Sequence, residues 1–196
     1  MRSLIFMVAV PVMVFGAGAQ AASIGNAGGL IADTPGIENG KPTADHANAQ
    51  DRLFVRQATL GGRAEVELGK LAQSRSKSPQ IRSFGEKMTA DHTRANDQLT
   101  RIGRSVNSEV PKGLDPSDAA FREELQQAQG TPFDQRYLLK QIGDHQRTLN
   151  LLQWELSYGQ NQALVEYSTE MMPIVHEHLR LAQAALAELT GSAAPR

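Results

Sequence analysis

The chain has 196 residues, with 20 basic and 21 acidic side chains and no cysteine. This length is typical of one domain with short extensions. Lysine and arginine are dispersed and balanced by acids, so no strong positive field favours nucleic acid as a partner. The lack of cysteine excludes disulfides, cysteine-ligated zinc, iron–sulfur clusters and thiol catalysis.

Residues 1–22 have the layout of a secretory signal peptide. Arg2 precedes an apolar stretch from Leu4 to Phe15, which is followed by a run of small residues ending near Ala22. Cleavage is expected after Ala21. An uncleaved anchor is the alternative, but the apolar stretch is shorter than the roughly 20 residues that a spanning helix needs. We therefore expect an exported protein, periplasmic or associated with the outer membrane, whose mature chain has no transmembrane span.

The rest of the chain divides into three parts by composition. Residues 23–49 are rich in Gly, Ala, Pro and Asn without a periodic apolar pattern, which predicts a flexible lead. Residues 50–190 carry apolar or small residues at intervals of three and four, a spacing typical of helices. Residues 191–196 are expected to form a disordered tail.

The helical part is expected to contain four long helices. The first follows Gln50, and the second begins at Ser78-Pro79, a capping residue followed by proline at the first helical position. The third begins by the same logic at Thr131-Pro132, and the fourth carries its apolar stripe from Leu164 to Ala185.

The connections between these helices predict how they are arranged. Short links at residues 74–78 and 159–161 favour two antiparallel hairpins. The stretch 103–130 is long enough for a crossover and is expected to hold a short helix at 116–129. The sequence therefore predicts an all-α fold, a four-helix bundle of two antiparallel hairpins joined by a long crossover with an extra helix.

One short pattern, an acid followed by histidine, any residue and arginine, occurs in three of the four predicted helices. The three copies are Asp91-His92-Thr93-Arg94, Asp144-His145-Gln146-Arg147 and Glu177-His178-Leu179-Arg180. Each histidine falls on the apolar stripe of its helix, and Glu65 takes the corresponding place on the first helix.

These residue types are suited to binding a transition metal. Neutral imidazole is a ligand for zinc, copper and iron, and a nearby carboxylate can orient a ring from another helix. The candidate ligands are Glu65, His92, His145 and His178. The neighbouring acids expected to orient them are Asp91, Asp144 and Glu177. Met88 and Met171 stand one and two turns before histidines, and their sulfur atoms would favour copper.

Two alternatives to a metal-binding role stay open. The histidines can be structural, or a pH-sensitive switch, in an envelope stress or interaction module; or a metal at this place can serve an oxidase or hydrolase. No nucleophile triad, phosphate loop or cofactor fingerprint favours an enzyme, so a non-catalytic role is preferred. At a rise of 1.5 Å per residue, Glu65 and His92 come out about 7 Å apart along the bundle, which weighs against their sharing one ion. His145 and His178 come out closer in level, about 4 to 5 Å apart.

An ordered set of residues resembles the bacterial DUF4142 family. The matching residues are Phe54, Ala58, Glu65, Leu68, Ala72, Phe84, Met88-Thr89-Ala90-Asp91-His92, Phe133-Asp134, Tyr137, Asp144-His145, Pro173 and His178-Leu179. The resemblance covers about residues 51–189 and implies a ferritin-like bundle in the cell envelope. An envelope protein and a second copy of the chain are the candidate partners. Glu-x-x-His, the ligand motif of di-iron ferritin-like proteins, is absent, so iron oxidation is not implied.

Overall fold

The computed structural model describes residues 42–44 and 46–191. All of them belong to the unit that spans Thr34–Arg196. The predicted signal peptide at 1–22, most of the predicted lead and residues 192–196 of the predicted tail lie outside the described residues. Within the described part of the chain, no helix is both long enough and apolar enough to cross a membrane.

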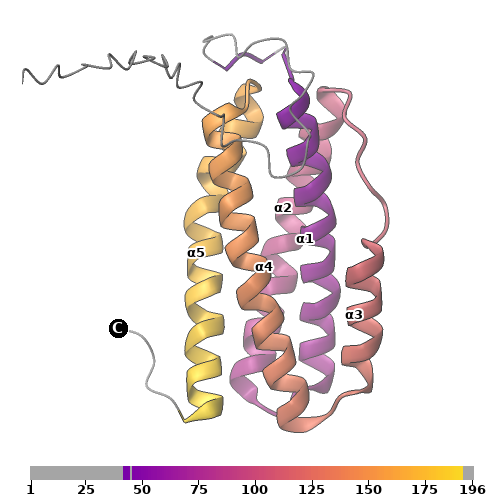
Figure 1. The fold of residues 1–196 in the computed structure, drawn as a ribbon, viewed down its shortest axis with the longest axis vertical. Coiled ribbons are helices and arrows are strands. Elements are labelled where there is room, and N and C mark those ends of the chain that lie inside the picture. Colours follow the sequence, from indigo (N-terminus) through magenta and orange to yellow (C-terminus); the bar gives the residue numbers. More distant parts are fainter. Residues whose placement is uncertain (1–41, 45, 192–196) are drawn as a thin grey trace, which may run out of the picture. The chain divides into compact units, whose positions relative to one another are not determined.

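The described residues contain five helices, which confirms the all-α prediction (Figure 1). They are α1 (Ala49–Arg75), α2 (Pro79–Ser105), α3 (Pro116–Gln127), α4 (Gly130–Tyr158) and α5 (Gln162–Thr190). No named strand occurs among these residues; an isolated bridge joins Thr43 to Asn161.

Local capping explains where the helices begin. The side chain of Ser78 accepts from the amide of Ile81, and Pro79 occupies the first position of α2, as predicted. At α1, Asn48 and Asp51 form a reciprocal capping box, so that helix begins at Ala49. Helix α4 begins at Gly130, earlier than predicted. Pro132 can stand inside its first turn because the backbone N–H groups of that turn have no acceptor within the helix, so the missing N–H of proline costs no hydrogen bond.

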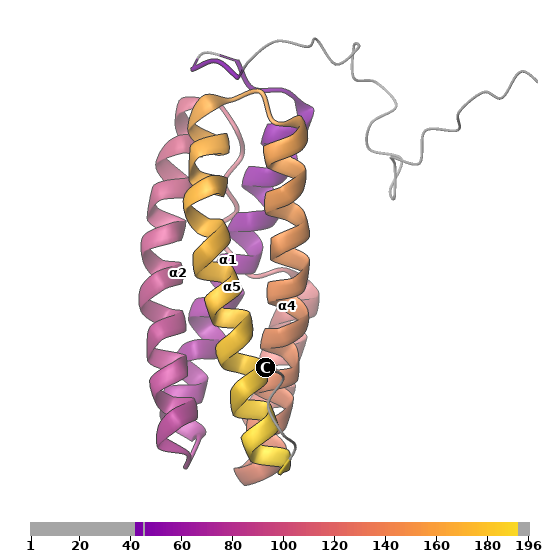
Figure 2. The same ribbon diagram turned by 90° about the vertical axis from the view of Figure 1, so that its left-hand side faces the viewer.

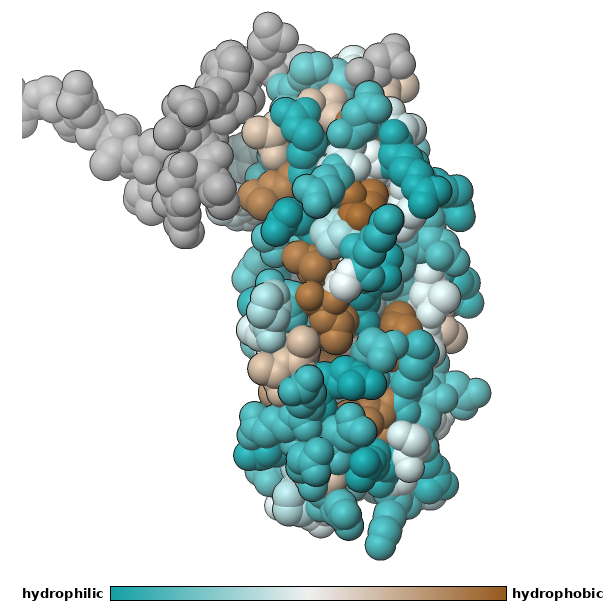
Figure 3. Space-filling view, turned by 90° about the vertical axis from the view of Figure 1, so that its right-hand side faces the viewer, coloured by the Kyte–Doolittle hydropathy of each residue, from teal (hydrophilic) through white to brown (hydrophobic). Residues whose placement is uncertain are grey.

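The four long helices pack side by side as a bundle. Helices α1 and α2 form one hairpin and α4 and α5 the other, with α1 also packed against α4 and α2 against α5 (Figure 2). The connection between the hairpins carries α3, which packs on the outside of α1 and α4. The side of the molecule that carries α3 is mostly hydrophilic, with a few hydrophobic residues showing between the hydrophilic ones (Figure 3).

The buried side chains form two apolar clusters, separated along the bundle by histidines. One cluster contains Leu68, Met88, Leu138 and Ala182, and the other contains Ala95, Leu152 and Val175 among others. His92 follows Met88 by one turn and precedes Ala95 in α2. His145 lies in the same way between Leu138 and Leu152, and His178 between Val175 and Ala182. The heptad-like spacing thus places one polar layer between two apolar layers.

The end of the predicted lead is paired with the turn between α4 and α5. The amide of Thr43 donates to the carbonyl of Gln160 at 2.8 Å, and the amide of Gln162 donates to the carbonyl of Thr43 at 3.0 Å. The buried carboxylate of Asp51 accepts from the amides of Gln160 and Asn161 at 3.0 and 3.1 Å. These bonds fix the α4–α5 turn to the start of α1.

Helices α1 and α2 approach closely at two glycines. A Cβ at Gly85 would lie 2.7 Å from the carbonyl oxygen of Gly69 and 2.9 Å from Cβ of Ala72. Beside this contact, the side-chain amide of Gln73 on α1 donates a hydrogen bond to Oγ1 of Thr89 on α2 at 2.8 Å. The absence of a side chain at Gly85 therefore sets the spacing of the first hairpin.

We expect Gly85→Ala to destabilise the protein by about 1–3 kcal/mol, because the added methyl meets backbone that cannot rotate away. Gly61→Ala in α1 is the matched control: a Cβ there meets nothing within 4 Å, so the substitution should stabilise by about 0.4–1 kcal/mol. Urea unfolding followed by circular dichroism measures both. Equal effects of the two substitutions would contradict this account of the contact.

Candidate metal centre

Three histidines from three helices converge in the middle of the bundle. His92 of α2, His145 of α4 and His178 of α5 are 6%, 1% and 0% exposed. Their ring centroids lie 5.4 to 5.7 Å apart in all three pairings. One ring nitrogen from each can be chosen so that the three atoms lie within 4.8 Å of one another. The cluster is therefore compact, buried and contributed by both hairpins.

The outer nitrogens of two of these rings are held by hydrogen-bond acceptors. Nδ1 of His145 lies 2.8 Å from the carbonyl oxygen of Gln141, one turn earlier in α4. Nε2 of His178 lies 2.9 Å from a carboxylate oxygen of Asp91 on α2. A carbonyl and a carboxylate only accept, so each of these nitrogens carries the hydrogen.

This assignment leaves the inner nitrogens of both rings without hydrogen. In a neutral imidazole only one nitrogen is protonated, so Nε2 of His145 and Nδ1 of His178 each present a lone pair. These two atoms face one another at 3.4 Å. Nε2 of His92 is also buried and has no hydrogen-bond partner in the described part of the chain.

The surroundings keep the three rings neutral. Burial lowers the pKa of His92 well below its usual value, and the neighbouring histidines lower it further. Burial, with a contribution from His178, lowers the pKa of His145 to about 4. Burial also lowers the pKa of His178, although Asp91 opposes that shift. At neutral pH the cluster thus consists of three uncharged imidazoles.

Asp91 is held as a carboxylate by two cations on its own helix. Lys87 donates to it at 2.9 Å, and Arg94 pairs with its other oxygen. Partial burial alone would raise the pKa of Asp91, but the hydrogen bonds from Lys87 and His178 outweigh it and lower the pKa. The acid of the first acid-histidine pair therefore orients a ring on another helix, not the ring beside it in sequence.

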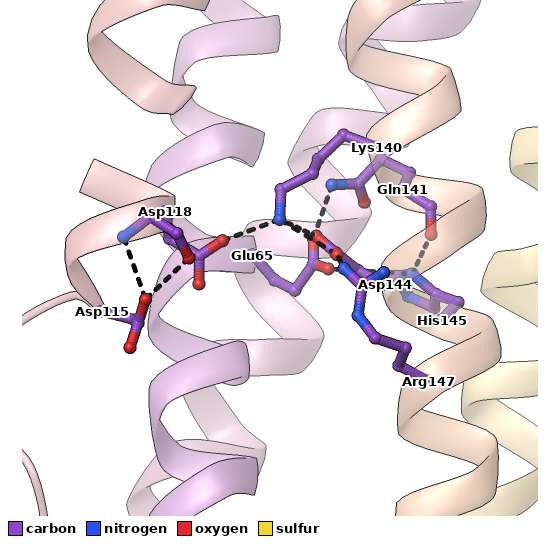
Figure 4. Close-up of polar contacts among 9 residues, drawn as sticks. Glu65, Asp115, Asp118, Lys140, Gln141, Asp144, His145 and Arg147 are labelled. Carbon is purple, nitrogen blue, oxygen red and sulfur yellow. Dashed lines mark hydrogen bonds and ion pairs between the residues drawn. The ribbon is translucent and has the colours of Figure 1, made fainter. Parts of the chain in front are cut away.

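Glu65 lies on the outer side of His145, away from the nitrogens that converge. Its Oε1 is 3.8 Å from Nδ1 of His145, and its Oε2 accepts a hydrogen bond from the side-chain amide of Gln141 at 2.6 Å. Burial, with the charge of Asp144, raises the pKa of Glu65 to about 8. Figure 4 shows this carboxyl beside Gln141 and His145.

The two other acids of the pattern are not hydrogen-bonded to a histidine. Asp144 pairs with Lys140 at 3.0 Å and with Arg147. Lys140 also binds Asp118 of α3 at 2.7 Å, so this network ties the crossover helix to α4 (Figure 4). Glu177 pairs with Arg180 on the same helix at 2.8 Å, and both side chains are largely exposed.

The methionines take different places. Met88 is fully buried in the apolar cluster at the α1–α2 turn, and Met171 belongs to the opposite cluster. Met171 and His92 both line a cavity of about 20 Å³. Gln141 is the residue that sequence reasoning did not single out: its carbonyl orients His145 and its amide binds Glu65. Its buried place one turn before a histidine is the signal that could have found it.

Comparison with known proteins identifies the family. The model of a domain of unknown function, DUF4142, matches residues 38–185. The search of curated proteins found no match, and the search of solved structures found none. The match spans α1 to α4 and most of α5, including all three histidines. The chain therefore belongs to the DUF4142 family.

Proposed function

We propose that this protein binds one transition-metal ion through His92, His145 and His178. The observation that carries the proposal is the pair of inner nitrogens that face one another at 3.4 Å with no hydrogen between them. Two lone pairs this close in a buried site repel each other unless a cation lies between them. A metal ion satisfies both atoms at once.

The spacing also fits a metal ion. Nitrogen ligands bind zinc at about 2.0–2.1 Å, so two of them on a tetrahedral ion are about 3.3–3.4 Å apart. The pair from His145 and His178 already has this separation. The third nitrogen lies within 4.8 Å of the others, and a small rotation of the His92 ring, whose Nε2 is bound to nothing else, would bring it to the same ion.

The supporting residues favour the same assignment. Histidine ligands usually donate their other ring hydrogen to a carboxylate or a backbone carbonyl, which fixes the ring orientation. His178 and His145 do so to Asp91 and Gln141. Glu65 lies at the donating nitrogen of His145, so we assign it a supporting role instead of a place among the ligands. An all-imidazole set suits zinc, copper or iron.

The wider description of the protein is part of this proposal. We propose an exported protein, because residues 1–22 have the layout of a signal peptide. We propose a non-catalytic binding role, because the sequence carries no nucleophile triad, phosphate loop or cofactor fingerprint. We further propose a ferritin-like topology; the two hairpins and the long connection bearing α3 support it. The metal would then occupy the bundle centre with histidines in place of the carboxylates of di-iron proteins.

The direct test is metal binding by the full chain without a polyhistidine tag. We expect one equivalent of zinc or copper per chain by elemental analysis after dialysis. Metal at about 100 times Kd should raise the free energy of unfolding by about 2.7 kcal/mol, and Tm by about 5–11 °C. His92→Asn should abolish both effects.

The chain offers a matched control on the same helix as one ligand. His176 is exposed and two residues from His178, so His176→Asn should bind metal like the parent, whereas His178→Asn should not. Circular dichroism of the metal-free variants checks that they are folded. A parent protein that stays metal-free, or a His178→Asn variant that binds as tightly as the parent, would contradict the proposal.

The acids of the repeated pattern give a second prediction. Asp91→Asn removes the charge that orients His178 and should weaken metal affinity about 10- to 100-fold. Glu177→Gln alters the equivalent acid of another copy, which is hydrogen-bonded to Arg180 on the surface and not to a histidine, and should leave the affinity unchanged. Competition with a chromophoric chelator measures both. Equal affinities for the two variants would show that Asp91 does not act on the metal site.

A further inference from the structure

We propose that the small cavity beside His92 holds an exchangeable fourth ligand of the metal ion, a water molecule that a small anion or a diatomic molecule can replace. This inference rests on the proposed metal site. The cavity has a volume of about 20 Å³ and lies among α1, α2, α4 and α5. Of the three histidines, His92 is the one that lines it.

The cavity has the size and the polar groups that one water molecule needs. A space of about 10–15 Å³ or more holds a water molecule if two to four polar groups surround it. Here the polar lining consists of Asn96, Thr148, Tyr167 and His92. The side chains of Asn96 and Thr148 have no hydrogen-bond partner within residues 42–44 and 46–191, so both are free to bind it.

The cavity lies beside His92, where the proposed metal ion would have a coordination position that no histidine fills. Three imidazoles supply three ligands, and a tetrahedral ion takes a fourth. The rings of His145 and His178 are backed by Gln141 and Asp91. No residue in the described part of the chain accepts a hydrogen bond from the His92 ring, which borders the cavity instead. A fourth ligand is therefore expected to come from the cavity.

The walls limit which molecules can bind. Phe54, Leu151 and Leu152 are among the apolar residues that line the cavity, and Ala58 lines it from α1. A small linear ligand of up to three heavy atoms, with one end on the metal and the other in the cavity, fits this space, whereas a chelating or bulky molecule does not. Met171 also lines the cavity, and its thioether is the competing candidate for the fourth position.

Cobalt(II) and azide provide the test. Cobalt(II) replaces zinc in nitrogen sites, and its visible spectrum depends on coordination number and ligands. In the full-length parent protein, one equivalent of cobalt should bind, and azide should then change the spectrum saturably. Ala58→Val adds two methyl groups to the cavity wall, so it should bind cobalt equally while the azide midpoint rises at least tenfold or the change is lost.

The same substitution at an exposed place is the control. Ala120 lies on α3, outside the bundle core, and Ala120→Val should respond to azide like the parent. Cobalt binding with no azide response would overturn the inference while leaving the metal site standing. A response restored by Met171→Leu would then assign the fourth position to sulfur. An equal response in Ala58→Val would exclude this cavity as the ligand's place. Failure of cobalt to bind at all would overturn both proposals.

Discussion

The structure depends on the burial of three imidazoles between two apolar clusters. The rings of His145 and His178 are closed off from bulk solvent there, and their outer nitrogens are already committed to Gln141 and Asp91. Two lone pairs at 3.4 Å are left to be satisfied inside the bundle. An apolar layer would have packed these helices without that cost. This unmet pair of lone pairs is the reason we propose a cation site here, one whose histidine rings are already oriented by Asp91 and Gln141.

Three copies of one sequence pattern have acquired three roles because their helices face different neighbours. Asp91 lies where α2 meets α5 and reaches the ring of His178. Asp144 lies beside the crossover helix and joins Lys140 and Arg147 in an ion-pair network. Glu177 faces outward and pairs within its own helix. The histidine fixes the inward register of each copy, while the tertiary environment decides what the acid does.

The sequence predicted the helices well because capping and apolar spacing are local. Ser78-Pro79 marked the start of α2, and the stripe residues of each helix proved to be mostly buried. Spacing alone also placed the three histidines and Glu65 inward. Counting residues from the turns gave His145 and His178 levels about 4 to 5 Å apart along the bundle, but it could not give the distance between their ring nitrogens, which is 3.4 Å. Helix crossing and side-chain reach decide that distance. The cavity depends on packing between helices and left no local pattern in the sequence.

The most direct measurement of the central claim is X-ray absorption spectroscopy of the zinc-loaded full chain. The account predicts a first coordination sphere of nitrogen or oxygen atoms at about 2.0–2.1 Å, with the outer-shell scattering of three imidazoles. The His92→Asn variant, loaded under the same conditions, should lose that signal. A spectrum with one imidazole or none, or one dominated by carboxylate oxygens, would contradict the claim that the three histidines bind the ion together.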